Sequence, residues 1–167
     1  MAVGKGDVKM IRIAGRAVIG RSMALLLAGA ALIVMSGCAS VPMASPDQDA
    51  EAKKFDAPPA KSRIYVYRNE SFGGAIYMTV SLDGRIMGRS AAQTFFVWDV
   101  APGKHTVSSH AEDVSMVTLE TAAGKSYYLW QEVKMGLWMA RSLLQQVDEK
   151  TGRAGVLECQ LAAPSTE

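Results

Sequence analysis

The sequence predicts an all-β fold: a small antiparallel β-sandwich of about seven or eight strands that follows a signal peptide and a disordered tether. Three observations predict it. Residues 62–135 alternate between apolar and other side chains with a period of two. Glycine, proline and Asp-Gly turn residues interrupt the alternation at short intervals. Residues 1–61 lack this alternation and differ in composition.

Residues 1–37 have the pattern of a secretory signal peptide. An apolar run of 13 residues, Met23 to Met35, follows five basic residues: Lys5, Lys9, Arg12, Arg16 and Arg21. Its length suits the apolar region of a signal peptide and is short of the roughly 18 residues of a membrane-spanning helix. We therefore expect cleavage, with translation starting at Met1, Met10 or Met23.

The end of the apolar run, Met35-Ser36-Gly37-Cys38, resembles the lipobox of bacterial lipoproteins. The resemblance implies cleavage before Cys38, a diacylglycerol thioether on that cysteine and acylation of the new amino terminus. Each buried CH₂ contributes about 0.8 kcal/mol, so several acyl chains anchor a protein stably. In Gram-negative bacteria Ala39 after the cysteine would imply sorting to the outer membrane. We expect the protein to lie in the bacterial envelope, on the outer membrane and facing the periplasm. The alternative is a simple signal peptide or signal anchor with an incidental cysteine.

Cleavage before Cys38 leaves 130 residues with 13 basic and 15 acidic side chains, a net charge of −2 at pH 7. This balance argues against nucleic acid as a partner, which requires clustered basic residues. Once Cys38 is lipidated, Cys159 is the only thiol, so no intramolecular disulfide can form. We interpret Cys159 as a small buried hydrophobic residue, with an intermolecular disulfide as the alternative.

Residues 38–61, the lipidated cysteine and the segment after it, are predicted to be a flexible tether. They are rich in Ala, Pro, Asp and Lys and have almost no large apolar residue, so they bury too little surface to fold. A coil of this length averages roughly 25 Å from end to end. The folded domain is expected to cover residues 62–161, with a disordered tail at 162–167.

Seven strands are predicted in residues 62–135. The first places Ile64 and Val66 on one face and Tyr65 and Tyr67 on the other. All seven cover residues 62–68, 75–82, 85–90, 94–100, 105–111, 115–121 and 126–135. Two packed antiparallel sheets would bury one face of each strand.

Two turns and an irregular tail complete the predicted fold. Asp83-Gly84 predicts a type I′ hairpin, and Pro102-Gly103 predicts a second turn. After a loop at 136–142, residues 143–149 are expected to form an eighth strand. Residues 151–162 form a strand or a short helix, because two glycines make a long helix costly.

Several segments together resemble a bacterial lipoprotein family known as domain of unknown function 2846. They are SRIYVYR, VSLDGRIMG, FFVWDVAPGKHTV, AAGKSYYLWQEV and VDEKTGRAGVLEC, within residues 62–161. The Asp-Gly and Gly-x-His spacing is also similar to PEGA repeats, which are small β-sandwiches. The resemblance implies the fold and the envelope location and carries no activity, because each motif consists of turn and strand residues.

Neither metal-binding nor nucleophilic chemistry is indicated. His105 and His110 lie five apart on one predicted strand, hence on opposite faces, and no third ligand has a recognisable spacing. We expect His105 to cap the turn after Lys104. No serine stands in a nucleophile elbow, and neither histidine has a recognisable partner pattern. The sequence thus predicts no metal, no cofactor and no catalytic residue.

The strongest candidate binding surface is aromatic. It comprises one face of the strand 126–135, with Tyr128, Trp130 and Glu132, and the nearby Trp138. Amphipathic aromatics at exposed positions often bind a partner or a sugar ring. The alternative is that Trp130 packs under the tail segment.

Two functions follow from these features. The first is a lipid-anchored, non-enzymatic interaction module that binds an envelope protein or glycan. The second is an envelope carbohydrate-processing enzyme or hydrolase. It rests on Trp130, Trp138 and scattered carboxylates, which are Asp99, Glu120, Glu132, Asp148 and Glu149.

Overall fold

The computed structural model describes Met1 and residues 41–72, 74–136 and 140–164. The chain divides between Gly37 and Cys38 into two compact units, and every described residue except Met1 belongs to the second. The expected signal peptide and the predicted site residues Cys38 and Trp138 lie outside the described residues. The described elements of the second unit are α2 (Pro46–Ala52), β1 (Ser62–Arg68), β2 (Met78–Leu82), β3 (Arg85–Ser90), β4 (Thr94–Val100), β5 (Gly103–His110), β6 (Val114–Thr121), β7 (Ser126–Met135), β8 (Ala140–Val147), α3 (Glu149–Leu157) and β9 (Gln160–Leu161).

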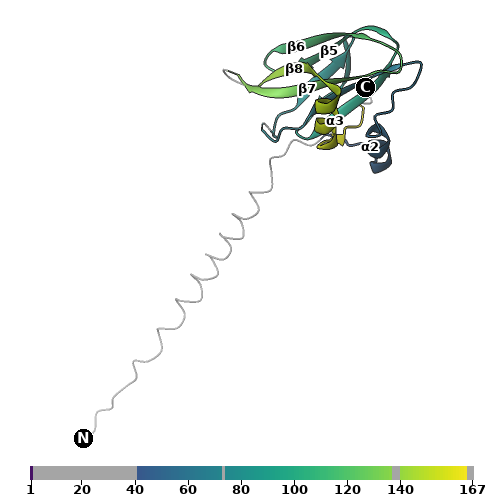
Figure 1. Ribbon diagram of the computed structural model, residues 1–167. Coiled ribbons are helices and arrows are strands. Elements are labelled where there is room, and N and C mark those ends of the chain that lie inside the picture. The colour runs from purple at the N-terminus through teal and green to yellow at the C-terminus, as the bar shows by residue number, and fades with distance from the viewer. Residues whose placement is uncertain (2–40, 73, 137–139, 165–167) are drawn as a thin grey trace. The chain divides into compact units, whose positions relative to one another are not determined.

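The strands form two sheets that pack face to face. The first sheet has five strands in the order β8-β7-β1-β4-β9, and the second has four in the order β3-β2-β5-β6. In Figure 1, β5 and β6 lie on one side of the domain and both labelled helices lie on the other. The predicted all-β sandwich is confirmed.

The period-two pattern predicted the strands well. Four of them, β1, β3, β4 and β7, have the predicted bounds. The hairpin between β2 and β3 is confirmed too, because Asp83 and Gly84 have φ values of 50° and 82°, both positive as a type I′ turn requires.

The five-stranded sheet is mixed, which corrects the purely antiparallel arrangement that the sequence suggested. β1 pairs with β4 antiparallel but with β7 parallel, and β9 pairs parallel with β4. A parallel pair needs a long crossover. Here the connection from β1 to β7 contains β4 and all four strands of the other sheet. The period-two pattern of single strands could therefore not reveal that β1 and β7 are parallel neighbours.

The core between the sheets is apolar with a polar group at its centre. Gln131, fully buried on β7, accepts a hydrogen bond from Ser90 Oγ at 2.6 Å and donates to Ser109 Oγ at 2.6 Å. Ser109 and Ser142 hydroxyls lie 2.5 Å apart. This chain of bonds links both sheets, since β3 and β5 belong to one and β7 and β8 to the other. The surrounding apolar core contains Ile64, Val66, Val80, Leu82, Phe96, Val107, Leu119, Leu129, Leu144 and Ala162.

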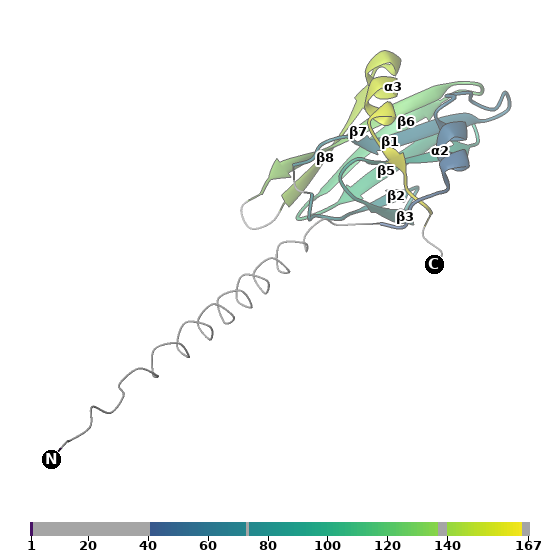
Figure 2. The same cartoon turned by 90° about the horizontal axis from the view of Figure 1, so that it is seen from below.

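The outer face of the five-stranded sheet carries a second, aromatic core under the helices. Both faces of β1 are buried for this reason: Ile64 and Val66 face the other sheet, while Tyr65 and Tyr67 face α2 and α3. Figure 2 shows α2 and α3 as separate coils beside the sheets. The Tyr65 and Tyr128 rings stack with centroids 5.0 Å apart. This core also contains Ala52, Phe55, Phe95, Val156 and Cys159.

The prediction of a flexible tether is wrong for residues 41–61, which contain the helix α2 and dock on the domain. Ser45 caps α2 in a capping box with Gln48, so the polar composition that suggested disorder supplies a helix start. The segment docks through Tyr65 Oη, which donates to the Ala52 carbonyl at 2.8 Å, and through Asp49 Oδ1, which accepts from the Leu161 amide at 2.8 Å. One large apolar residue, Phe55, enters the aromatic core.

The C-terminal region is also more ordered than the sequence suggested. The predicted eighth strand is present as β8, but it begins at Ala140, inside the predicted loop, and ends at Val147. Residues 151–162 contain the expected short helix, α3, which Asp148 caps, followed by the two-residue strand β9. Ala162, assigned to a disordered tail, is 3% exposed and donates its amide to Phe95 O at 2.9 Å. The domain therefore extends on both sides of the predicted boundaries.

Candidate functional site

The aromatic face predicted on β7 is only partly exposed. Tyr128 is 1% exposed and lies in the aromatic core under α3. Trp130 is half-buried and packs against the same core, which agrees with the alternative that it packs under the tail segment. Glu132 bonds to Lys134 and accepts from Gln145 Nε2 at 3.0 Å. The prediction that these residues form an exposed binding face is therefore wrong for Tyr128, because α3 covers it.

The sheet face that stays open belongs instead to β3, β2, β5 and β6. The two described helices contact strands of the five-stranded sheet, β1, β7 and β9. On the outer face of the four-stranded sheet, Ile86 and Met116 are 55% and 65% exposed. We refer to this surface as the open face.

Cross-strand registers place the open-face side chains in rows. One row runs across the sheet from β3 to β6 as Ile86, Ser81, Ser108 and Met116, and the next as Arg89, Thr79, His110 and Val114. Directly opposite residues share one face of a sheet. Ser81 and Ser108, 4% and 8% exposed, are thus short central residues between long apolar neighbours. At one side, the Arg89 guanidinium lies 5.0 Å from the Tyr77 ring centroid.

The open face also joins a serine to a histidine that the sequence did not connect. Ser81 Oγ and His110 Nε2 lie 3.2 Å apart. The two side chains meet because of the register in which β2 pairs with β5, and a single sequence does not reveal that register. Ser81 sits inside a strand whose backbone is committed to β3 and β5, whereas a nucleophilic serine needs nearby backbone donors for the oxyanion. We therefore interpret the contact between Ser81 and His110 as a structural hydrogen bond.

The other histidine links two family motifs. His105 Nδ1 lies 2.7 Å from Asp83 Oδ2 in the β2–β3 turn, and Nε2 lies 2.7 Å from the Ala101 carbonyl before β5. Carboxylate and carbonyl oxygens only accept hydrogen bonds, so both contacts form together only when the imidazole is protonated. The hydrogen bond to Asp83 raises the pKa of His105, against the opposing effect of burial. The expected turn-capping role of His105 is confirmed.

A pH-dependent contribution to stability follows from this contact. The folded-state pKa of His105 is above the unfolded value of about 6.5. Its stabilising effect is therefore complete below the unfolded pKa and is lost as the pH rises through the folded one. We expect the difference in unfolding free energy between wild type and His105→Gln to shrink on going from about pH 5 to about pH 9 in urea titrations. A difference that grows with pH would contradict the assignment.

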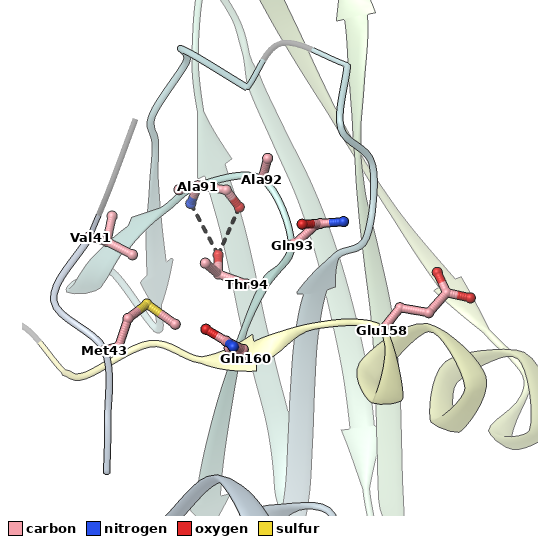
Figure 3. A pocket seen from close by; sticks show the side chains of 8 residues that line it. All are labelled: Val41, Met43, Ala91, Ala92, Gln93, Thr94, Glu158 and Gln160. Carbon is pink, nitrogen blue, oxygen red and sulfur yellow. Dashed lines mark hydrogen bonds between the residues drawn. The ribbon is translucent and has the colours of Figure 1, made fainter. Parts of the chain in front are cut away.

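One pocket lies next to the segment that leads back to Cys38. Its volume is about 350 Å³, and Figure 3 shows its lining: Val41, Met43, Ala91, Ala92, Gln93, Thr94, Glu158 and Gln160. The turn that forms one wall is held by Thr94 Oγ1, which accepts from the Ala91 amide and donates to its carbonyl. Gln93 has a φ of 56°, and its backbone carbonyl accepts a hydrogen bond from the Gln160 amide at 2.9 Å. The lining mixes apolar and uncharged polar groups with one carboxylate.

The remaining candidate groups show no assembled reactive site within the described residues. Cys159 is 2% exposed, and burial raises the pKa of its thiol to about 12, which confirms the interpretation as a buried hydrophobic residue. Among the residues that the structure describes, no group of three or more His, Cys, Asp or Glu side chains is placed to hold a metal ion. Neither described helix has the length and hydrophobicity to cross a membrane.

Comparison with known proteins identifies the family. The sequence model of a family described as "Protein of unknown function (DUF2846)" matches residues 58–142, which span β1 to β7, the Asp83-Gly84 turn and the His105 contact. The chain belongs to this family. It is 33% identical over 132 residues to a Haemophilus influenzae protein named "Uncharacterized protein", covering 78% of this chain and 79% of that one. No solved structure matches the chain. The similarity to PEGA repeats stays a prediction.

Proposed function

We propose that this DUF2846 protein is a lipid-anchored protein of the bacterial envelope, on the outer membrane facing the periplasm, and acts as a non-enzymatic binding module. The lipobox-like sequence before Cys38 supports the anchor. The division of the chain between Gly37 and Cys38 supports it further, because cleavage there leaves the second unit whole.

The open face is the observation that supports binding. Its exposed Ile86, Val114 and Met116 are large apolar side chains on the outside of a sheet. Methionine is enriched in protein interfaces, and its flexible side chain adapts to different partners. Since apolar side chains flank the serines, the face suits an envelope protein better than a glycan. The proposed partner is therefore a protein.

The anchor has a direct test. We expect intact-mass analysis of the membrane fraction to show a chain that begins at Cys38 and carries a lipid-sized addition. The Cys38→Ala variant should lose the addition and either leave the membrane fraction or remain as the precursor, because Cys159, the other thiol of the chain, is buried. An unmodified wild-type chain would contradict the anchor.

The binding role is tested by site-specific photo-crosslinking in intact cells. A photoreactive amino acid at Met116 should give one discrete protein adduct, and the same amino acid at Ala123, in the exposed turn before β7, should not. Ser108→Arg should abolish the Met116 adduct, because its long charged side chain would stand at the centre of the open face. Adducts that persist with Ser108→Arg, or that contain only glycan, would contradict a protein partner.

A further inference from the structure

We infer that the end of the sandwich where β1 ends and β4 begins lies directly against the phospholipid surface of the membrane. This inference rests on the proposed acylation of Cys38. The surface in question carries Met43, Phe72 and Met135, and we call it the anchor end. It is distinct from the open face, which lies on the side of the four-stranded sheet.

The first argument is the length of chain between the lipid and the folded domain. Val41 already packs against the core between the sheets. The next residues pair with the C-terminal strand region: Ala163 donates its amide to Pro42 O at 2.8 Å, and Ala44 donates to Leu161 O at 2.9 Å. Only three Cα–Cα steps separate Cys38 from Val41, which span at most about 11 Å. The domain therefore cannot move far from the bilayer.

The second argument is what the anchor end exposes. Phe72, four residues after β1, is 57% exposed, and Met135, the last residue of β7, is 80% exposed. β1 and β7 run parallel, so both residues lie beyond the C-terminal end of β1. That end also holds the start of β4, whose Thr94 lines the pocket with Val41 and Met43. In Figure 1, β7 and β8 lie side by side and extend to one side of the domain.

The chemistry of the anchor end fits a lipid surface. Exposed apolar side chains gathered on one part of a protein mark interaction sites, and aromatic and apolar residues enter the headgroup boundary. Acidic groups nearby are neutralised or bonded: Asp113 pairs with Arg141 at 3.0 Å, and Glu158 accepts from Asn69 Nδ2 at 2.7 Å. The opposite end consists of exposed turns of small and charged residues, such as Asp83-Gly84 and residues 122–125. Contact of the anchor end with the bilayer thus buries apolar surface, while Asp113 and Glu158 keep the partners that they have in the structure.

The test measures distance from the membrane with a fluorescent label. Acylated variants Phe72→Cys and Met135→Cys, expressed from the full-length sequence, are labelled and placed in vesicles of phosphatidylethanolamine and phosphatidylglycerol. Ala123→Cys is the control at the opposite end. A fraction of the lipid carries a nitroxide on the headgroup as quencher. Cys159 is buried and Cys38 carries the lipid, so the introduced thiol takes the label. We expect several-fold stronger quenching at Phe72 and Met135 than at Ala123.

The outcomes separate this inference from the proposed function. Intact mass is measured first on each purified variant. Unmodified Cys38 would overturn the anchor, and the inference with it. Full acylation with equal quenching at all three labels, or with the strongest quenching at Ala123, would overturn only the inference, because the domain would then be anchored without a preferred orientation or with the opposite one.

Discussion

Gly152→Ala is expected to detach α3 from the sheet and to destabilise the domain by about 3 kcal/mol. A Cβ at this position would lie 2.2 Å from Tyr128 Cγ and 2.3 Å from Tyr128 Cβ. These atoms are next to the backbone of β7, so no rotation of the ring relieves the overlap. Tyr128 also stacks on Tyr65, which blocks any shift deeper into the core. The helix-propensity gain of about 1 kcal/mol for alanine is smaller than this strain.

A graded series tests the explanation. Gly155→Ala should cost less, because its Cβ meets Tyr67 Cε2 at 2.1 Å and Cζ at 2.6 Å, which lie toward the far end of a ring. Lys150→Ala, an exposed change in the same helix, should stay within about 0.5 kcal/mol of wild type. Urea unfolding followed by tryptophan fluorescence gives all three values. Equal stability of Gly152→Ala and wild type would show that α3 does not pack closely on Tyr128.

These glycines show where sequence reasoning reached its limit. Gly152 and Gly155 argued on propensity against a long helix, and α3 is short, but propensity did not show that they let its backbone approach two tyrosine rings. Propensity is a local preference, and tertiary packing overrides it. The strands were predictable because the alternation of apolar side chains is also a local pattern. The turn at Asp83-Gly84 was predictable because both residue types accept the positive φ values that a type I′ turn requires.

The candidate site depended on contacts that no local pattern encodes. Tyr128 and Trp130 alternate correctly on β7, but only the arrival of α3 decides that their face is covered. Ser81 and His110 meet because β2 pairs with β5, across 29 positions of sequence. The capping box at Ser45 was readable in the sequence, and the low content of apolar residues around it obscured a helix that a single phenylalanine anchors.

Phe55→Ala is expected to destabilise the domain by about 3 kcal/mol and to release residues 41–57 from the sheet. Phe55 is 9% exposed, its ring lies 5.5 Å from the Tyr65 ring, and the Arg153 guanidinium lies 5.0 Å from its centroid. Its φ of 62° is unfavourable for a bulky residue. Alanine retains that backbone strain while losing the ring contacts, so nothing offsets the loss. Urea unfolding gives the stability, and amide exchange at Ala44 and Leu161 reports release of the segment.

Phe55→Ala is also expected to increase the distance that the domain can move from the membrane. With residues 41–57 released, the flexible link between the lipid and the domain would run from Cys38 to β1 and average roughly 25 Å from end to end. With the segment docked, the link runs only from Cys38 to Val41 and spans at most about 11 Å. Lys54 is next to Phe55 in sequence and forms an exposed salt bridge with Glu51. Lys54→Ala should therefore leave both the unfolding free energy and the amide exchange unchanged. If Phe55→Ala unfolds no more readily than Lys54→Ala and the Leu161 amide stays protected, the segment is held by its hydrogen bonds to β9 rather than by the aromatic core.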